Sequence, residues 1–473
     1  MKKNIILLFL SLFCGLVLIQ SCKKNDDESI PDPPNTEPPL GTTFIEPSAQ
    51  RSGDAQAGYE YLIYGDYVDA GIPYDLYINI FGTNTENLLQ RTGDNEILAP
   101  GVTALNAPNG VRVVATNCMQ CHAQKINGDF VMGLGNSVAD FTTDQSNNAQ
   151  TLDLGVQFTY GANSLEYEAF EPFGRALTAI GPHIVAPKVG LNPAAKLAVV
   201  LAAHRDINDL SWQSSPLIPI PDETITSDVP PWWVMKKKNA LFYSAGGMGD
   251  FARISMASSL MTLQDSTKAR AVEQKFVDVM AYIKTLEPPV YPKTIDQEKL
   301  ARGEVLFEYN CVACHGYHGA NSTYPNLLVE LDKVGTDPVL AGSNYTDEAF
   351  RQWYNNSWFS TFPAAAQFNP GAGYIAPPLD GIWASAPYLH NGSVPTLEDL
   401  LDSSQRPVYW ERSFDTSDYD FEKVGWNYEV QSGANTKKIY DTTLLGYGNG
   451  GHTFGDHFTE EERSDLIEYL KSI

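Results

Sequence analysis

The chain has 473 residues, 43% of them apolar and including 24 Tyr and 21 Phe, so it can bury the cores of two or three domains. Its formal net charge of −25 argues against a nucleic acid partner, because phosphates would repel an acidic surface. The six Cys are too few for a disulfide-rich scaffold in a chain of this length.

The first residues have the pattern of an export signal. Two lysines precede an uncharged apolar run over residues 5–19, which is too short and too near the terminus for a convincing membrane span. The run leads to Cys22 through a sequence similar to a bacterial lipoprotein processing box. We therefore predict a signal peptide over residues 1–21, a lipid on Cys22 and a membrane-anchored protein of the bacterial cell envelope. An ordinary secretory signal and a retained anchor are the alternatives, and both also place the body outside the cytoplasm.

Residues 22–45 are predicted to form a tether. The segment begins with charged residues and continues with five Pro between positions 31 and 39. Such a composition cannot bury enough apolar surface to fold. The segment would hold the folded body away from the membrane.

Two copies of Cys-x-x-Cys-His are the most informative motifs in the chain. They occupy residues 118–122 and 311–315 and use four of the six Cys. Two thiols three positions apart can reach both vinyl groups of one porphyrin, and the adjacent imidazole can then bind the iron as its proximal ligand. A zinc knuckle would need four N or S ligands in one cluster, and a redox dithiol does not explain the His after each pair. We predict two covalently bound haem c groups, held by Cys118, Cys121 and His122, and by Cys311, Cys314 and His315.

Between the two motifs lies Pro-Pro-Trp-Trp-Val-Met-Lys-Lys-Lys, at residues 230–238. The paired prolines favour an extended approach, and the indole of Trp232 or Trp233 could pack between two porphyrins and bridge them electronically. The alternative is that both are ordinary core aromatics. The lysines could bind haem propionates or form a solvated face.

Two amphipathic helices with similar sequences are predicted to close two repeated units. Residues 271–286 place apolar side chains on one face and end before a pair of prolines. Residues 459–473 do the same, with Thr459 as N-cap and Glu462 in the capping-box position. Tyr-Ile-Lys-Thr-Leu at the end of the first helix aligns with Tyr-Leu-Lys-Ser-Ile at the end of the second.

A further amphipathic helix, over residues 296–308, is predicted to lead into the second haem motif. Strand signals are sparse, and 37 Gly and 30 Pro indicate many turns. The fold class we predict is mainly α, with two cytochrome c-like haem domains that carry long loop insertions. They would cover residues 46–290 and 291–473.

The axial ligand opposite His315 is predicted to be a second imidazole. The last Met of the chain is Met280, so a His/Met pair built within the C-terminal domain is excluded. His452 lies in a glycine-rich loop before the closing helix, where backbone can approach the porphyrin, and is our first choice. His390 is the second choice. His318 would lie on the same side of the ring as His315, and His457 is expected on the surface.

The first haem has no obvious second ligand. No His lies between His122 and His183, and the first Met after His122 is Met132. We expect Met132, His183 and His204 to be packed or hydrogen-bonded side chains. The first iron is then open or weakly capped, which makes it the predicted reaction site for a small oxidant, O2 or H2O2.

Together with residues 249–253, residues 379–393 and the Gly-His near the end, these motifs resemble the dihaem rubber-oxygenase-like cytochromes. That family is related to the bacterial dihaem cytochrome c peroxidases and the methylamine-utilisation dihaem enzymes. The resemblance spans residues 52–473 and implies an oxidant-binding first haem, a bis-His second haem with His452 as ligand, and a bridging Trp232 or Trp233. The chain departs from the peroxidases in having no His about fifteen residues after the first motif, and in having Ser404 where they place a Met.

The sequence therefore predicts a haem oxidoreductase, dioxygenase-like or peroxidase-like, with His122, Trp232 and Trp233 in catalytic roles and the second haem in electron transfer. Two alternatives stay open: a cytochrome c peroxidase that reduces H2O2 with an external donor, and a non-enzymatic electron-transfer cytochrome. The organic substrate or electron donor is unknown, and calcium binding stays open.

Overall fold

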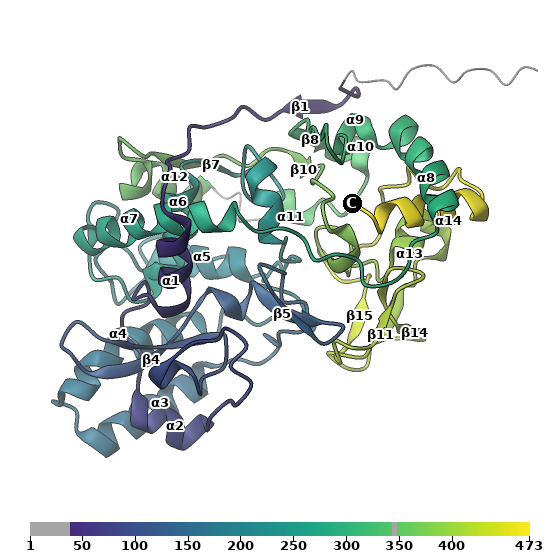
Figure 1. Ribbon diagram of the computed structural model, residues 1–473. Coiled ribbons are helices and arrows are strands. Elements are labelled where there is room, and N and C mark those ends of the chain that lie inside the picture. Colours follow the sequence, from purple (N-terminus) through teal and green to yellow (C-terminus); the bar gives the residue numbers. More distant parts are fainter. Residues whose placement is uncertain (1–37, 343–347) are drawn as a thin grey trace, which may run out of the picture. The chain divides into compact units, whose positions relative to one another are not determined.

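The computed structural model describes residues 38–342 and 348–473 (Figure 1). The predicted signal peptide, Cys22 and most of the predicted tether lie outside the described residues. In the part of the chain that is described, no helix is both long and apolar enough to cross a bilayer.

The fold is a mixed one, and the expected mainly α pair of cytochrome c-like domains is wrong. Helices account for 37% of the structure and strands for 13%, the strands forming several small sheets. No strand in the described part of the chain is longer than five residues. Strands this short show no clear alternation of polar and apolar residues, so the sequence pattern did not reveal them.

The helices of the described residues are α1 (Ala55–Tyr64), α2 (Tyr74–Phe81), α3 (Ser146–Tyr160), α4 (Leu165–Ile180), α5 (Ala194–Ala203), α6 (Phe251–Ser255), α7 (Ser266–Ile283), α8 (Gln297–Asn310), α9 (Val312–His315), α10 (Leu331–Val334), α11 (Val339–Gly342), α12 (Glu348–Asn356), α13 (Leu397–Leu401) and α14 (Glu460–Leu470). The strands are β1 (Thr42–Phe44), β2 (Ile72–Pro73), β3 (Val102–Asn106), β4 (Arg112–Thr116), β5 (Ala123–Ile126), β6 (Asp129–Met132), β7 (Gly247–Gly249), β8 (Leu327–Glu330), β9 (Ala366–Phe368), β10 (Gly373–Ile375), β11 (Tyr409–Arg412), β12 (Tyr419–Asp420), β13 (Gly425–Trp426), β14 (Tyr428–Val430) and β15 (Ile439–Asp441).

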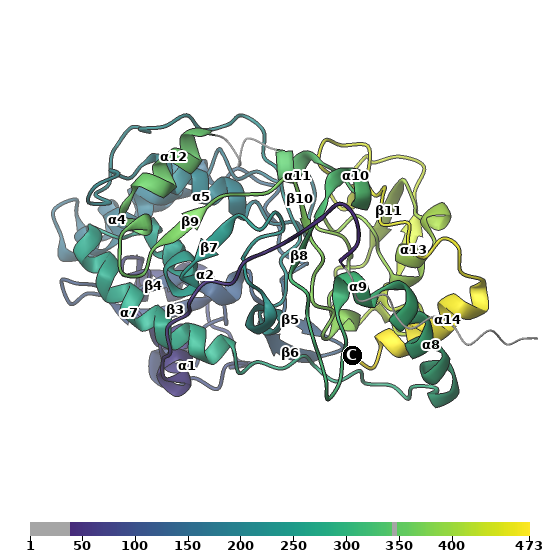
Figure 2. The same cartoon turned by 90° about the horizontal axis from the view of Figure 1, so that it is seen from above.

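The three-stranded sheets have the orders β1-β8-β10, β14-β11-β15 and β2-β4-β3, and three further pairs are β12-β13, β5-β6 and β7-β9. All of these pairs are antiparallel. Strand β1 comes from the end of the segment predicted as a tether, and its Thr42 is in register with Val329 of β8 (Figure 2). The last residues of that segment are therefore part of a sheet.

Two helix pairs have the same construction. Helix α1 packs on α7, and α8 packs on α14. Each first helix begins at an aspartate N-cap, Asp54 or Asp296, whose side chain accepts two backbone N–H groups. The three helices predicted over 271–286, 296–308 and 459–473 are confirmed as α7, α8 and α14, and Thr459 and Glu462 form the expected capping box.

A glycine lies where the helices of each pair cross. A Cβ atom at Gly58 would collide with the backbone carbonyl of Asp278 in α7. A Cβ atom at Gly303 would collide in the same way with the carbonyl of Asp465 in α14. The absence of a side chain at these two positions lets the paired backbones approach closely.

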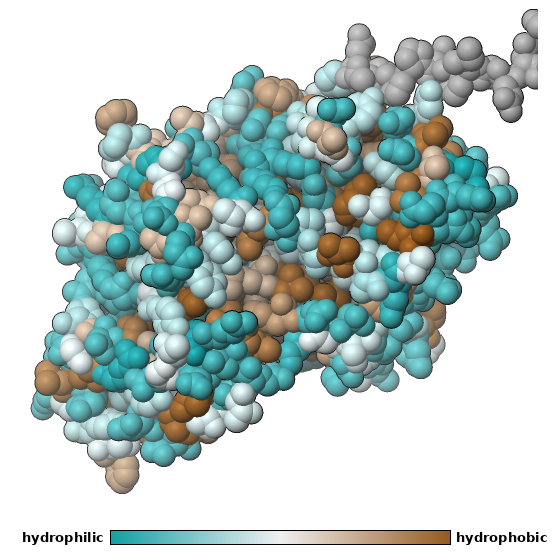
Figure 3. Space-filling view, viewed as in Figure 1, coloured by the Kyte–Doolittle hydropathy of each residue, from teal (hydrophilic) through white to brown (hydrophobic). Residues whose placement is uncertain are grey.

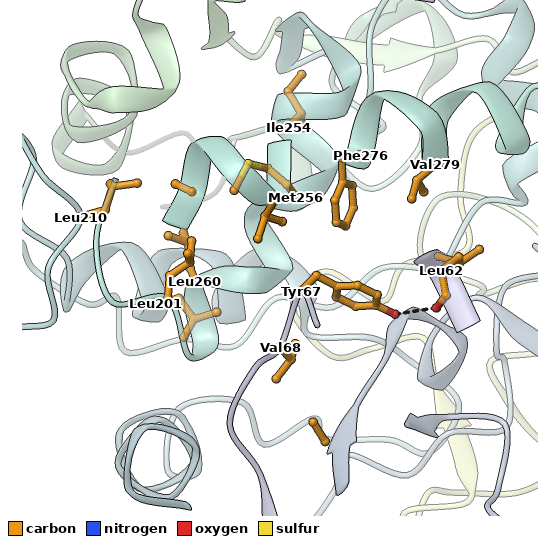
Figure 4. Packing of buried hydrophobic residues seen from close by; sticks show 14 of the residues in the cluster. Leu62, Tyr67, Val68, Leu201, Leu210, Ile254, Met256, Leu260, Phe276 and Val279 are labelled. Carbon is orange, nitrogen blue, oxygen red and sulfur yellow. Dashed lines mark hydrogen bonds between the residues drawn. The ribbon is translucent and has the colours of Figure 1, made fainter. Parts of the chain in front are cut away.

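Two large apolar clusters form the core. The first is built mainly from residues before 290, and Figure 4 shows part of it, with the Tyr67 hydroxyl donating to the carbonyl of Leu62 at 3.0 Å. It also contains Phe350, Trp353 and Trp358, which lie well after residue 290 in the sequence. The second cluster is built mainly from residues after 290 and takes in four residues from before it, Ile126, Leu134, Trp233 and Val234.

Each cluster therefore contains residues from both sides of the expected domain boundary between residues 290 and 291. That boundary remains a prediction.

Hydrophilic residues cover most of the face shown in Figure 3, with apolar residues in smaller groups between them.

Candidate haem sites

The first Cys-x-x-Cys-His motif folds as one tight turn after β4. Asn117 caps this turn by accepting the backbone N–H of Met119 at 2.9 Å, and the N–H groups of Cys121 and His122 donate to the carbonyl of Cys118. Both thiols are free, and burial raises the pKa of Cys118 to about 11. The local backbone thus brings two unpaired thiols and an imidazole together.

The second motif continues helix α8 into the short helix α9. The His315 N–H donates to the carbonyl of Cys311 at 3.0 Å, and both thiols of this motif are free as well. The Nδ1 atom of His315 lies 2.8 Å from the carbonyl oxygen of Pro377. Because only an N–H can satisfy that carbonyl, Nδ1 carries the proton and Nε2 keeps its lone pair for a metal.

His452 lies next to His315. The centres of the two imidazole rings are 6.3 Å apart, and their planes are inclined at 59°. With a metal–nitrogen bond of about 2.0 Å and a ring centre about 1.1 Å beyond each nitrogen, two imidazoles on opposite sides of one metal have centres about 6 Å apart. The spacing of the two rings is therefore suited to one iron between them.

The other histidines of the C-terminal part have different neighbours. His390, the second choice, is buried and stacks on Tyr374 with ring centres 4.0 Å apart, and its Nε2 atom has no partner. His318 packs edge-on against Phe307, with Nδ1 4.0 Å from a carboxylate oxygen of Asp380. His457 is exposed, as expected.

At the first motif the ring next to the histidine is an indole. His122 stacks on Trp232 with ring centres 4.7 Å apart and planes inclined at 24°. Burial lowers the pKa of His122 to about 4, so the ring is neutral, and its Nδ1 atom is buried without a hydrogen-bond partner. Among residues 38–342 and 348–473, Trp232 is the one aromatic ring, imidazoles included, found stacked on His122.

Two of the side chains considered as weak ligands of the first iron are engaged elsewhere. The Met132 sulfur accepts the hydroxyl of Tyr282 at 3.3 Å. The Nδ1 atom of His204 lies 2.8 Å from the carbonyl of Gln213, and its ring stacks on Trp212. The third, His183, follows α4 in a turn and is partly buried.

The two tryptophans belong to different cores. Both start the 3₁₀ helix η3 (Trp232–Lys237), but Trp232 lies in the first apolar cluster and Trp233 in the second. The Trp233 Nε1 atom donates to the carbonyl of Asp380 at 2.7 Å.

Two of the three lysines that follow form ion pairs with carboxylates of the chain itself. Lys236 pairs with Glu287 at 2.5 Å, and Lys237 with Asp380 at 2.6 Å. Burial lowers the pKa of the third, Lys238, to about 8.

Sequence reasoning missed Pro377 and Arg406. Pro377 supplies the carbonyl that holds His315, although it lies 62 positions later in the sequence. Arg406 binds the backbone of the loop that carries His452. Neither position carries a local signal, because each hydrogen bond joins a side chain to a backbone carbonyl far away in sequence.

The donor atoms fit covalently bound haem. Each motif offers two free thiols beside a half-buried imidazole. Zinc gains no support, because the described residues contain no group of three or more His, Cys, Asp or Glu side chains arranged for a metal ion.

Comparison with known proteins agrees with this chemistry. Residues 373–411 match the model of a family described as RoxA-like, cytochrome c-like, and this match supports a cytochrome with covalently bound haem c. The matched range contains Pro377, Asp380, His390 and Arg406.

Two relatives come from Sinorhizobium fredii (strain NBRC 101917 / NGR234). The uncharacterized protein y4iM is 30% identical over 313 residues, which cover 57% of this chain and 69% of that protein. The uncharacterized protein y4iJ is 27% identical over 256 residues, covering 40% of this chain and 41% of its own length. The chain therefore belongs to the same family as y4iM and carries within it a RoxA-like, cytochrome c-like domain.

Proposed function

We propose that the protein is an extracytoplasmic dihaem c-type oxidoreductase in which the first haem reacts with O2 or peroxide and the second transfers electrons. The observation that supports this most is the difference between the two motif histidines. His315 has the imidazole of His452 at 6.3 Å, whereas His122 has the indole of Trp232 stacked on it. Each haem supplies an iron that changes oxidation state, and an iron with one protein ligand can also bind a small oxidant.

Burial keeps His315 and His452 in the neutral form that an iron ligand requires. It lowers the pKa of His452 to about 4 and also lowers the pKa of His315 below its usual value. Both rings are therefore neutral at physiological pH, as a metal ligand must be. The bond from His315 Nδ1 to Pro377 fixes the ring orientation and the tautomer.

A continuous series of contacts connects the two proximal histidines. It begins with the stacking of His122 on Trp232, continues along the backbone to Trp233, and crosses by the hydrogen bond from Trp233 Nε1 to the carbonyl of Asp380. Residues 377–380 then lead to the carbonyl that accepts the Nδ1–H of His315. This series supports a role for both tryptophans in electron exchange between the haem sites.

The deciding experiment is a count of ferric spin states by electron paramagnetic resonance in the purified dihaem protein. We expect one high-spin and one low-spin iron, and CO binding to about half of the ferrous haem, because one of two irons keeps an open position. His452→Ala should convert the low-spin iron to the high-spin state and allow CO to bind to the second haem. His390→Ala is the matched control and should leave the spin states unchanged.

Two low-spin irons, with no binding of CO or cyanide, would contradict the proposal and leave an electron-transfer cytochrome. If one iron is open, the substrate separates the two enzyme classes. Turnover of H2O2 with a reduced donor favours a peroxidase. Consumption of O2 with an unsaturated hydrocarbon favours an oxygenase.

We also propose that a lipid on Cys22 anchors the protein to a membrane of the cell envelope. The support is the sequence pattern of residues 1–22. Cys22→Ala should move the haem protein from the membrane fraction to the soluble fraction of the envelope. Retention in the membrane fraction would place the anchor elsewhere.

A further inference from the structure

His452 and His315 are oriented by different means. The Nδ1 atom of His315 donates to the Pro377 carbonyl, but the Nδ1 atom of His452 is buried without a partner. Metal-binding histidines are usually oriented by a hydrogen bond from the nitrogen that does not bind the metal. Because His452 lacks that bond, its orientation depends on the backbone that carries it.

Arg406 binds that backbone. Its Nη1 atom donates to the carbonyls of Asn449 and Gly451 at 2.8 and 2.6 Å, and its Nη2 atom donates to the carbonyl of His452 at 3.2 Å. Its other bonds go to helix α13, from Nε to the carbonyl of Asp399 at 3.0 Å and from Nη2 to that of Leu400 at 2.8 Å. A guanidinium has five N–H donors, so all of them are directed at backbone carbonyls.

Arg406 is buried without an ion pair among the described residues, which is unusual for an arginine. Arg406 is 9% exposed, and burial lowers its pKa against an opposing effect of Asp456, Asp399 and Asp402, none of which forms an ion pair with it within 4 Å. Desolvating a cation without a paired anion is unfavourable unless every donor is satisfied. The three carbonyls of residues 449–452 accept hydrogen bonds from the guanidinium only while the loop keeps its present conformation.

The loop contains two consecutive residues with positive φ, Gly451 and His452. His452 has φ = 46°, which is unusual for a residue with a side chain, and its N–H donates to the carbonyl of Val334 at 2.7 Å. Gly451 has φ = 76° and packs directly on the backbone of Gly335. Arg406 is the side chain that ties this strained turn to α13.

We propose that Arg406 is a positioning residue for the second haem: it holds residues 449–452 so that the His452 ring stays opposite His315. The inference rests on the proposed role of His452 as an iron ligand. Without Arg406 the turn would relax, and His452 would leave the iron more often.

The test uses the full-length dihaem protein and the variants Arg406→Ala, Arg406→Lys and His452→Ala. Lysine keeps the charge but cannot direct five donors at five carbonyls. The control is Arg302→Ala, since Arg302 lies in the same half of the chain and binds a carboxylate of Asp465 rather than the His452 loop. The readouts are the ferric spin state of the second haem, the rate of CO binding to it, and the effect of added imidazole.

We expect Arg406→Ala to give a partly high-spin second haem and a CO-binding rate at least about tenfold above wild type, since three hydrogen bonds to the loop are lost. Imidazole should restore the low-spin signal, which distinguishes a misplaced ligand from general unfolding. Arg406→Lys should show a smaller change in the same direction, and Arg302→Ala none.

A wild-type spin state and CO rate in Arg406→Ala would overturn the proposal. If Arg406→Ala yields no folded dihaem protein, Arg406→Lys decides by the same measurements, and a wild-type CO rate would overturn it. His452→Ala separates this failure from the failure of the proposed function. If the second haem of His452→Ala stays low-spin, His452 is not its ligand. If that haem becomes high-spin while the Arg406 variants behave as wild type, only the role of Arg406 is excluded.

Discussion

At the scale of single residues, each motif histidine is defined by what contacts its ring. The carbonyl of Pro377 fixes the protonated nitrogen of His315, while His122 has the flat face of Trp232 and a buried Nδ1 atom with no partner. A donated hydrogen bond makes an imidazole a stronger metal ligand, and stacking does not. The two irons would therefore differ in proximal ligand strength as well as in their second ligand.

The contacts of the tryptophans predict different effects for the two substitutions. Trp233→Phe removes the hydrogen bond to the Asp380 carbonyl and should slow electron exchange between the haems without changing the spectrum of the first haem. Trp232→Leu removes the ring stacked on His122 and should change that spectrum as well. Flash photolysis or stopped-flow reduction measures the exchange. Trp212→Phe, which lies outside the series of contacts, is the control, and wild-type exchange in both variants would exclude the bridge.

Asp228 predicts a dependence of stability on pH. Burial raises its pKa to about 7, against a smaller lowering by the hydrogen bond from the Tyr243 hydroxyl at 3.2 Å. The folded state thus holds a proton that the unfolded state has lost, so stability should fall as the pH rises from about 4 to about 7 and then level off. The limit for this group is about 4 kcal/mol, from about 1.4 kcal/mol per pH unit, and partial exposure makes the effect smaller.

The measurement is denaturant unfolding at pH 5 and pH 8. Asp228→Asn should reduce the difference in unfolding free energy between the two pH values, because the amide does not titrate. Asp332→Asn, at an exposed position, is the control. An unchanged pH dependence in Asp228→Asn would show that another group is responsible.

The residues that could be predicted are those fixed by local spacing. The four Cys and the two motif His follow from five-residue motifs, and Thr459 with Glu462 follows from a capping box of four residues. The proximity of His452 to His315 was expected from a glycine-rich loop. Pro377 and Arg406 could not be predicted, because a backbone carbonyl accepts a hydrogen bond whatever side chain its residue carries.

At the scale of elements, the long amphipathic helices were predictable and the short strands were not. Helices α7, α8 and α14 repeat apolar residues over three or more turns, which gives a clear period. Strands of two to five residues give no period, and their pairing joins segments far apart, as β1 with β8. Helix α1 was also missed, although it packs on α7 as α8 packs on α14.

The crossing of α8 and α14 predicts an unusual response to a Gly→Ala substitution. In a helix this change normally stabilises by about 1 kcal/mol, and Gly155→Ala in α3 should do so because nothing lies within 4 Å of its new methyl group. Gly303→Ala should instead destabilise by about 1–3 kcal/mol, since its methyl group meets the carbonyl of Asp465. Urea unfolding of both variants measures the difference. Stabilisation by Gly303→Ala would mean that the two helices lie farther apart.

At the scale of the whole described chain, the apolar clusters around the two haem motifs contain residues from both sides of the expected boundary at residue 290. The first cluster includes Phe350, Trp353 and Trp358, and the second includes Trp233. The contacts that join the proximal histidines run through this shared region. The proposed electron exchange between the motifs would therefore depend on packing contributed by both halves of the sequence.

This sharing predicts that a cut between the halves leaves them together. Val290 is 89% exposed in the segment that follows α7, so a protease site inserted there can be cleaved in the folded protein. The nicked halves should elute as one species in size-exclusion chromatography and keep the spin states of the intact protein. They should separate only in denaturant, because separation would expose Trp353 and Trp233 of the two clusters, at about 1.5–3 kcal/mol for each large apolar side chain. Halves that separate in native buffer, each with its haem spectrum intact, would instead establish two independent domains joined at residue 290.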